Sequence, residues 1–312
     1  DGVPVQCPSP AGAGGLGRAR ARAGPAPQRR DVAIIPRQAA ARHVVVIMDE
    51  SVRGDLLDLH RPDGAYSGLR GHAAAADFGI MSSIAGCSAP SNAGFRYGIA
   101  RRSYLADLAA NPSIWRYARK AGFRTVYLDG QRHGGGLMNL MSAEERADID
   151  QHIQLAPRTP PAQRDIELAR RLARLLRDAP RPVFAYVNKA GAHFPYEGKY
   201  PPERAAFQPV MPRTYFGDEV DPRDILWPQN DSEDARARFR NSYLNVLAWN
   251  VGGFFDALLA GVDLAGTVIV YMADHGQNLN EDGAPGFRTH CSIDAAPPTE
   301  GIVPLVVLTR QP

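Results

Sequence analysis

The stretch HVVVIMDES at residues 43–51 decides the fold of this chain. It is an unbroken run of β-branched and other apolar residues that ends in two acidic residues, Asp49 and Glu50, and a serine. An apolar run without alternation is typical of a strand that is buried on both faces, as in a parallel sheet. We therefore expect a buried strand at 43–48, with the carboxylates that follow it at the edge of the sheet.

Similar apolar runs recur along the chain, and segments with helical periodicity separate them. Apolar residues at three- and four-residue steps indicate helices at 113–121, 164–178 and about 234–261. The further strands are expected at 125–128, 183–187, 268–272 and 302–308. Alternating helices and buried strands predict an α/β fold, a three-layer sandwich with a mostly parallel central sheet.

The chain of 312 residues divides into a basic N-terminal segment and a slightly acidic remainder. Residues 1–42 are rich in Ala, Gly, Pro and Arg, lack periodicity and carry a balance of +5, so that −2 of the formal +3 falls on residues 43–312. We interpret 1–42 as a flexible linker and 43–312 as one folded domain. The acidic balance of the domain argues against nucleic acid as a partner. No apolar run approaches the roughly 20 residues of a membrane-spanning helix.

Polar side chains follow three of the predicted strands. Glu50 follows the first, His193 lies shortly after the one at 183–187, and Asp274 and His275 follow the next. Because the carboxyl ends of parallel strands meet at one edge of a sheet, we expect these side chains to converge. Carboxylate oxygens and imidazole suit a divalent ion such as zinc or manganese, with a position left open for a substrate or a nucleophile.

A candidate hydroxyl nucleophile lies between the first two predicted strands, in residues 82–99. Small residues lead there into Ala89 and Pro90, and proline is favoured in the first turn of a helix. Ser88 is thereby placed near a helix N-terminus, where free N–H groups and the helix dipole favour an anion. A serine that only caps the helix fits the same position, so the residues alone leave both roles open.

The ordered set of Glu50, Ser88, Asp274, His275 and a later His290 resembles the alkaline phosphatase superfamily. The likeness is strongest to the branch that holds sulfatases, lipoteichoic acid synthases and bacterial phosphoethanolamine transferases. It implies a divalent metal, zinc first with manganese or calcium as alternatives, and one or two ions in all. The metal ligands that the resemblance implies are Glu50, Ser88, Asp274 and His275.

The resemblance spans roughly residues 43–308 and identifies 43–312 as a metal-dependent catalytic domain. His193, in the sequence Gly-Ala-His-Phe-Pro-Tyr, resembles the turn with which these enzymes contact the transferred group or a second metal. His290 resembles the histidine that follows the family's Asp-His pair after a loop. Both histidines are therefore expected to bind phosphate or a second ion and to assist proton transfer.

The resemblance leaves two serines as candidates for the nucleophile. The family's nucleophile is commonly followed by proline two places on and by glycine ten places on, and Ser88, Pro90 and Gly98 reproduce this register. Phosphoethanolamine transferases often place a cysteine four residues before their threonine, and Cys87 stands four residues before Ser91. Ser88 is the preferred nucleophile and Ser91 the alternative.

The chain departs from the family's patterns in two places. A sulfatase needs arginine four residues after the residue that becomes formylglycine, and Asn92 occupies that position, so this conversion is not expected. The several bridged cysteine pairs typical of periplasmic phosphoethanolamine transferases are missing. Cys87 and Cys291 each adjoin a proposed site residue, and a single bridge between them across the site is a hypothesis.

The resemblance implies a metal-dependent phosphotransferase with a covalent phosphoserine intermediate. The expected donor is a phospholipid or another phosphodiester, with phosphatidylethanolamine named first, and the acceptor is lipid A, an envelope glycan or water. The expected place is the periplasmic face of the bacterial inner membrane, close to the membrane through an N-terminal anchor ahead of the linker. The alternatives are a sulfatase-like hydrolase of phosphodiesters or sulfate esters, and a metal-free pseudoenzyme that serves as a binding domain.

Overall fold

A single mixed sheet organises the computed structural model, which describes residues 29–33, 41–212, 232–281, 289–292 and 296–310. The sheet has seven strands in the order β2-β7-β6-β1-β5-β3-β4. Its strands are β1 His43–Asp49, β2 Ala75–Ser82, β3 Arg124–Asp129, β4 Gln151–Gln154, β5 Val183–Asn188, β6 Thr267–Ala273 and β7 Ile302–Thr309. The five strands from β6 to β4 are parallel. At the other end β7 runs antiparallel to β6, and β2 runs antiparallel to β7 and so in the same direction as the five. The predicted α/β fold with a mostly parallel sheet is confirmed.

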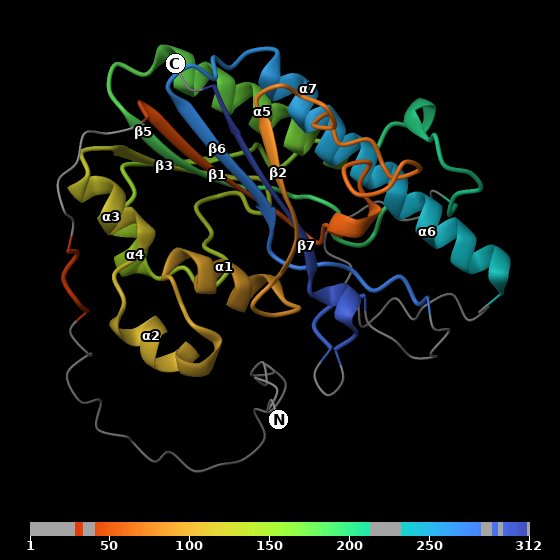
Figure 1. Ribbon diagram of the computed structural model, residues 1–312, viewed down its shortest axis with the longest axis horizontal. Coiled ribbons are helices and arrows are strands. Elements are labelled where there is room, and N and C mark those ends of the chain that lie inside the picture. Colours follow the sequence, from red (N-terminus) through yellow and green to blue (C-terminus); the bar gives the residue numbers. More distant parts are fainter. Residues whose placement is uncertain (1–28, 34–40, 213–231, 282–288, 293–295, 311–312) are drawn as a thin grey trace, which may run out of the picture.

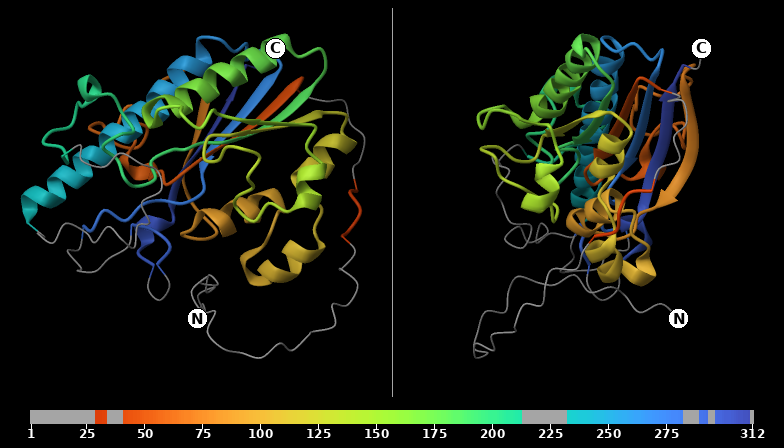
Figure 2. Two further views of the ribbon diagram at one scale, coloured as in Figure 1. Left: turned by 180° about the vertical axis from the view of Figure 1, so that it is seen from behind. Right: turned by 90° about the vertical axis from the view of Figure 1, so that its left-hand side faces the viewer.

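Helices cover both faces of the sheet and make the other two layers. They are α1 Ser88–Arg96, α2 Tyr104–Ala110, α3 Ile114–Lys120, α4 Ala143–Ala147, α5 Pro161–Asp178, α6 Glu233–Leu247 and α7 Phe254–Leu259, with a π-helical segment Ala248–Gly253 joining the last two. One core lies between the sheet and α5, α6 and α7, and a second, aromatic core lies between the sheet and α3. Figure 1 shows α5 to α7 gathered on one side of the strands and α1 to α4 on the other, and Figure 2 shows the layers from two further directions.

Two strands, β2 and β4, are not among those predicted from the sequence. β2 is an edge strand whose residues are mostly exposed, with a register shift between Asp77 and Ile80, so it lacks a buried apolar run. β4 has only four residues, all half-buried. Both are edge strands that contribute little to the core, which is why hydrophobicity alone did not reveal them.

The predicted linker 1–42 is described at residues 29–33 and 41–42, because residues 1–28 and 34–40 lie outside the described part. There Arg29 lies over the ring of Tyr97 and donates hydrogen bonds to the carbonyl oxygens of Leu108 and Asn111 at 2.9 and 2.8 Å. This short piece therefore packs against α1 and the end of α2. Within the described residues, no helix combines the length and apolar character needed to cross a membrane.

A fully buried ion pair fixes the C-terminal end of α1. Arg96 and Glu145 have no exposed side-chain surface, and Arg96 Nε lies 2.5 Å from Glu145 Oε1. Glu145 also accepts hydrogen bonds from Trp115 Nε1 at 3.0 Å and from the Tyr97 hydroxyl at 3.2 Å. The carboxylate thus ties α1, α3 and α4 together through several charge-assisted hydrogen bonds.

Replacing Glu145 by alanine is predicted to destabilise the domain by about 3–5 kcal/mol, because it leaves the buried Arg96 charge without its carboxylate partner. Chemical denaturation followed by tryptophan fluorescence measures the loss. The neighbouring Glu144, whose side chain is 56% exposed and paired with Arg116, is the control. Glu144→Ala is expected to cost no more than about 1 kcal/mol, and equal losses for the two variants would contradict the prediction.

Candidate active site

The register of two parallel strands brings the acidic residues together. In the pairing of β1 with β6, Asp49 lies opposite Ala273, so Glu50 and Asp274 leave neighbouring strands at the same edge. The backbone pairing continues one step further, since Asp274 N donates to Asp49 O at 2.9 Å. Both side chains are at least 97% buried. The convergence expected at the carboxyl edge of the sheet is therefore present for this pair.

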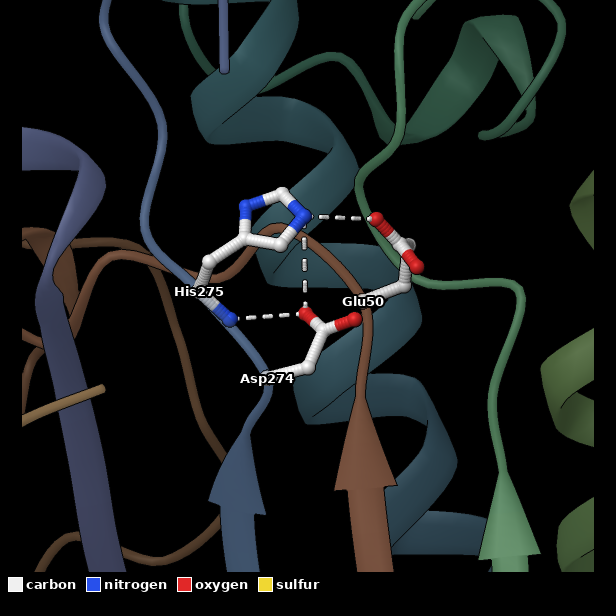
Figure 3. Close-up of side chains that lie close together, drawn as sticks. All are labelled: Glu50, Asp274 and His275. Atoms are coloured by element: carbon white, nitrogen blue, oxygen red, sulfur yellow. Dashed lines mark hydrogen bonds and ion pairs between the residues drawn. The ribbon is translucent and has the colours of Figure 1, made fainter. Parts of the chain in front are cut away.

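His275 completes a compact cluster with the two carboxylates, drawn in Figure 3. One ligand atom from each of Glu50, Asp274 and His275 lies within 4.8 Å of the others. His275 Nε2 is 3.2 Å from Glu50 Oε1 and 3.8 Å from Asp274 Oδ1. Its Nδ1 lies 2.7 Å from the carbonyl oxygen of Gly276, to which it donates its proton. That contact turns Nε2 toward the carboxylates, the orientation of a metal-ligating histidine.

Tight backbone packing fixes Glu50 in place. Ser51, the next residue, has a φ of 60°, which is uncommon for a residue other than glycine, and its hydroxyl donates to Glu50 Oε1 at 2.8 Å. Gly191, after β5, approaches so closely that an added Cβ would lie 2.4 Å from the carbonyl oxygen of Glu50. Ala192 N donates to that same carbonyl at 2.8 Å. Only glycine fits at 191, and this close approach locks the end of β1.

The Ser88 hydroxyl points into the cluster. Ser88 is the first residue of α1, with Cys87 as the N-cap. Its Oγ lies 3.0 and 2.9 Å from the two carboxylate oxygens of Glu50 and 3.2 Å from His275 Nε2. The predicted helix start is confirmed, and the structure brings Ser88, Glu50, Asp274 and His275 into one group.

Ser91 lies at a cavity next to the cluster and not in the cluster itself. Its hydroxyl donates to the carbonyl oxygen of Ala85 at 2.9 Å. Ser91 lines a mostly apolar cavity of about 430 Å³ between α1 and the sheet, with Met48, Met272 and Leu305 among the other lining residues. Asp274 lies at the boundary between this cavity and the cluster. The geometry therefore favours Ser88 over Ser91 as the hydroxyl that meets a metal ion.

His193 and His290 lie beside the cluster rather than in it. The ring of His290 stacks on that of His275 with centroids 4.8 Å apart, and the ring of His193 meets His290 edge-on at 5.0 Å. His193 Nδ1 lies 2.5 Å from the carbonyl oxygen of Phe194. The two histidines thus form a second group of imidazoles next to the Ser88 hydroxyl's partner, His275.

The buried ionisable groups of the cluster have shifted pKa values. Burial favours a raised pKa for Glu50, but the hydrogen bond and charge of His275 outweigh it and hold that pKa well below its usual range. Burial, reinforced by the charge of Glu50, raises the pKa of Asp274. Burial lowers the pKa of His275, yet Asp274 and Glu50 overcome it and raise it to about 10. Burial lowers the pKa of His193.

A divalent cation fits this donor set. Zinc ligands lie about 2 Å from the ion, so ligand atoms of one ion are within about 4 Å of each other. Atoms that already lie within 4.8 Å need only small shifts to meet that limit. Two carboxylates supply negative charge, and the proton held by His275 is of the kind that metal binding displaces.

The hypothesis of a bridge across the site is confirmed. Cys87 and Cys291 form a disulfide with Cα atoms 4.8 Å apart, over a sequence separation of 204 residues. Cys291 N also donates to the carbonyl oxygen of Gly86 at 2.7 Å. The bridge joins the N-cap of α1 directly to the residue after His290.

Two amide side chains that contact the cluster were not predicted as site residues. Gln131, two residues after β3, donates to Glu50 Oε2 at 3.0 Å. Asn92, noted in the sequence only for the missing arginine, donates to Asp274 Oδ2 at 3.2 Å. The strand-end rule that identified Glu50 and Asp274 also identifies Gln131 when it is applied to 125–128.

Comparisons with known proteins bear on the family and on the fold. A model of the sulfatase family matches residues 42–310. The zinc-bound C-terminal periplasmic domain of EptC from Escherichia coli is similar at 14% identity and a TM-score of 0.64, over 87% of this chain and 74% of that one. The soluble domain of lipooligosaccharide phosphoethanolamine transferase A from Neisseria meningitidis is similar at 17% identity and a TM-score of 0.62, over 88% and 78%.

A hydrolase shares the fold as well. Phosphonate monoester hydrolase of Agrobacterium radiobacter is similar at 15% identity and a TM-score of 0.57, over 86% of this chain and 68% of that one. A search of curated protein sequences found no match. At these identities the solved structures establish the fold, whereas the family model covers nearly all of residues 43–312.

Opening the disulfide is predicted to destabilise the domain by about 2–5 kcal/mol, since it releases a loop of 204 residues in the unfolded chain. The Cys87→Ala/Cys291→Ala double variant is compared with the oxidised protein by thermal unfolding. Cys7→Ala, at the third cysteine, is the control and is expected to leave Tm unchanged. Peptide mass spectrometry that finds both thiols free in the oxidised protein would contradict the assignment.

Proposed function

The chain belongs to the sulfatase family, and from this premise we propose that it is a metal-dependent phosphotransferase of the phosphoethanolamine transferase type. One observation carries the proposal: the Ser88 hydroxyl lies 2.9 Å from Glu50 Oε2 and 3.2 Å from His275 Nε2, at a helix N-terminus. A hydroxyl in that position is suited to attack a phosphorus atom.

We propose zinc as the ion, with Glu50, Asp274, His275 and Ser88 as the residues that hold it. Such an ion supplies positive charge that favours the ionised form of a hydroxyl and offsets the charge that builds on phosphoryl oxygens. The helix N-terminus at Ser88 adds N–H groups and a favourable dipole for the same charge.

The reaction proceeds by two displacements. Ser88 Oγ gives its proton to a water molecule and attacks phosphorus, and the bond from phosphorus to the lipid alcohol breaks. The departing oxygen takes a proton from His193 or His290, and the substituted phosphate stays on Ser88. An acceptor hydroxyl then attacks phosphorus and gives its proton to the same histidine pair. The bond from phosphorus to Ser88 Oγ breaks, and Ser88 Oγ takes back a proton from water.

The proposed donor is a phospholipid, phosphatidylethanolamine first, and the proposed acceptor is lipid A or an envelope glycan, with water as the hydrolytic alternative. The similar solved structures include the C-terminal periplasmic domain of phosphoethanolamine transferase EptC from Campylobacter jejuni and the soluble domain of lipooligosaccharide phosphoethanolamine transferase A from Neisseria meningitidis. Both support this donor, and the first supports a place at the periplasmic face of the inner membrane. Asn92 at the position where a sulfatase needs arginine favours a serine nucleophile over formylglycine.

Removing the Ser88 hydroxyl is predicted to lower turnover of an aryl phosphodiester by at least about 10³-fold, because a covalent route has no other nucleophile. Ser91→Ala is expected to stay within about threefold, since its hydroxyl is bound to Ala85 O away from the cluster. Trapping the intermediate with phosphatidylethanolamine is expected to add phosphoethanolamine to the peptide that contains Ser88.

Three outcomes would redirect the proposal. Modification at Ser91 would move the nucleophile by one helical turn. Faster turnover of an aryl sulfate than of the phosphodiester would make the protein a sulfate ester hydrolase. Turnover unaffected by Ser88→Ala, Ser91→Ala and Glu50→Gln, together with elemental analysis that finds no bound metal, would favour a metal-free pseudoenzyme that serves as a binding domain.

The metal assignment predicts that Glu50→Gln weakens zinc binding by at least about tenfold, since it removes a charged ligand and keeps the shape of the side chain. Competition with a chromophoric chelator measures the affinity, and elemental analysis gives the stoichiometry. Glu144→Gln, an exposed site on α4, is the matched control. Equal affinities for the two variants would place the ion elsewhere.

A further inference from the structure

The buried side-chain amide of Asn92 connects the first turn of α1 to Asp274, a proposed metal ligand, through hydrogen bonds. Asn92 is 1% exposed and lies one helical turn after Ser88. Its Nδ2 donates to the Ser88 carbonyl oxygen at 3.1 Å and to Asp274 Oδ2 at 3.2 Å. Its Oδ1 accepts from the Tyr186 hydroxyl at 2.8 Å. The orientation of the amide follows from these partners, because only its NH₂ end is able to donate to a carbonyl and a carboxylate.

Asn92 donates a hydrogen bond to Asp274 Oδ2, the carboxylate oxygen that accepts no backbone hydrogen bond. Asp274 Oδ1 accepts from the backbone N–H groups of Ser51 at 3.2 Å and of His275 at 2.7 Å. Oδ2 accepts from Asn92. With both oxygens engaged, rotation of the carboxylate is restricted.

Gln131 restricts the carboxylate of Glu50 in the same way, through a hydrogen bond from its side-chain amide. Its Nε2 donates to Glu50 Oε2 at 3.0 Å and to the carbonyl oxygen of Lys189 at 2.8 Å. Its Oε1 lies 3.5 Å from Asn139 Nδ2. The amide is thus anchored to the ends of β3 and β5 while it contacts Glu50.

We propose that Asn92 and Gln131 are positioning residues, one for each carboxylate of the metal cluster, and that Asn92 also sets the distance from Ser88 to Asp274. The inference rests on the proposed function for the identity of the ion and goes beyond it in the residues that orient the ligands. A primary amide orients a carboxylate without cancelling its charge.

The test measures zinc affinity, which does not depend on turnover. Asn92→Leu and Gln131→Met keep similar volume and remove the amide, and each is expected to raise the zinc dissociation constant by about 10–100-fold. Substitution with Co²⁺ adds a second measure, since its visible spectrum reports ligand geometry and is expected to change in both variants. Circular dichroism and Tm establish that each variant is folded.

A matched control exists at the other end of α1. Asn111 also braces the helix by donating from its amide to the carbonyl oxygen of Tyr97 at 3.0 Å, and it has no hydrogen bond to the cluster. Asn111→Leu is therefore expected to lower Tm without changing zinc affinity. If Asn92→Leu does not fold, Gln131→Met decides alone, because Gln131 is only half-buried.

The outcomes separate this inference from the proposed function. Zinc affinities within about twofold of wild type in the folded variants, with an unchanged Co²⁺ spectrum, overturn the positioning roles. An affinity loss in the Asn92 and Gln131 variants together with full turnover in Ser88→Ala supports the positioning roles and refutes Ser88 as the nucleophile. A loss in Asn111→Leu equal to that in the two variants would assign the effect to general loosening of α1 and overturn the proposal.

Discussion

The site depends on the parallel register between β1 and β6. Because Asp49 pairs with Ala273, the residues that follow these strands, Glu50 and Asp274, are neighbours at the same edge. A slip of one residue would reverse which face each side chain of a strand points to, and would separate the two carboxylates. The register is fixed by the apolar residues of β1 and β6 in the two cores, so the same burial that stabilises the sheet also assembles the acidic pair.

The two adjacent acids at the end of β1 have opposite electrostatic surroundings. Asp49 is fully buried and lies 2.5 Å from Lys189 Nζ, which also donates to Asn250 O at 2.6 Å, so its negative charge is balanced within the fold. Glu50 instead contacts a histidine, two hydroxyls and an amide. No lysine or arginine contacts it among the hydrogen bonds and ion pairs of the described residues. Glu50 and Asp274 are therefore balanced by the neighbouring imidazole of His275 instead of by a lysine or arginine, and a bound cation is able to displace the imidazole proton.

Much of this arrangement follows from sequence pattern, and the limits have physical reasons. Buried strands are long apolar runs, so the chain positions of Glu50, Asp274 and His275 at strand ends were predictable. Edge strands such as β2 and β4 lack such runs and were missed. The sequence left Ser88 and Ser91 open, since their choice depends on which face of α1 meets the sheet edge and which meets the cavity. That is a matter of helix rotation, which spacing motifs do not determine.

The position of the Ser88 hydroxyl is set by contacts from distant parts of the chain. The disulfide to Cys291 holds the residue before it, and Asn92 joins its carbonyl to Asp274. At the other end of the helix, Arg96 is buried against Glu145. The helix itself has only nine residues and includes a glycine and a proline, so it has little intrinsic stability. Its order must come from these long-range contacts, and the placement of the proposed nucleophile is consequently a property of the whole domain rather than of the local motif.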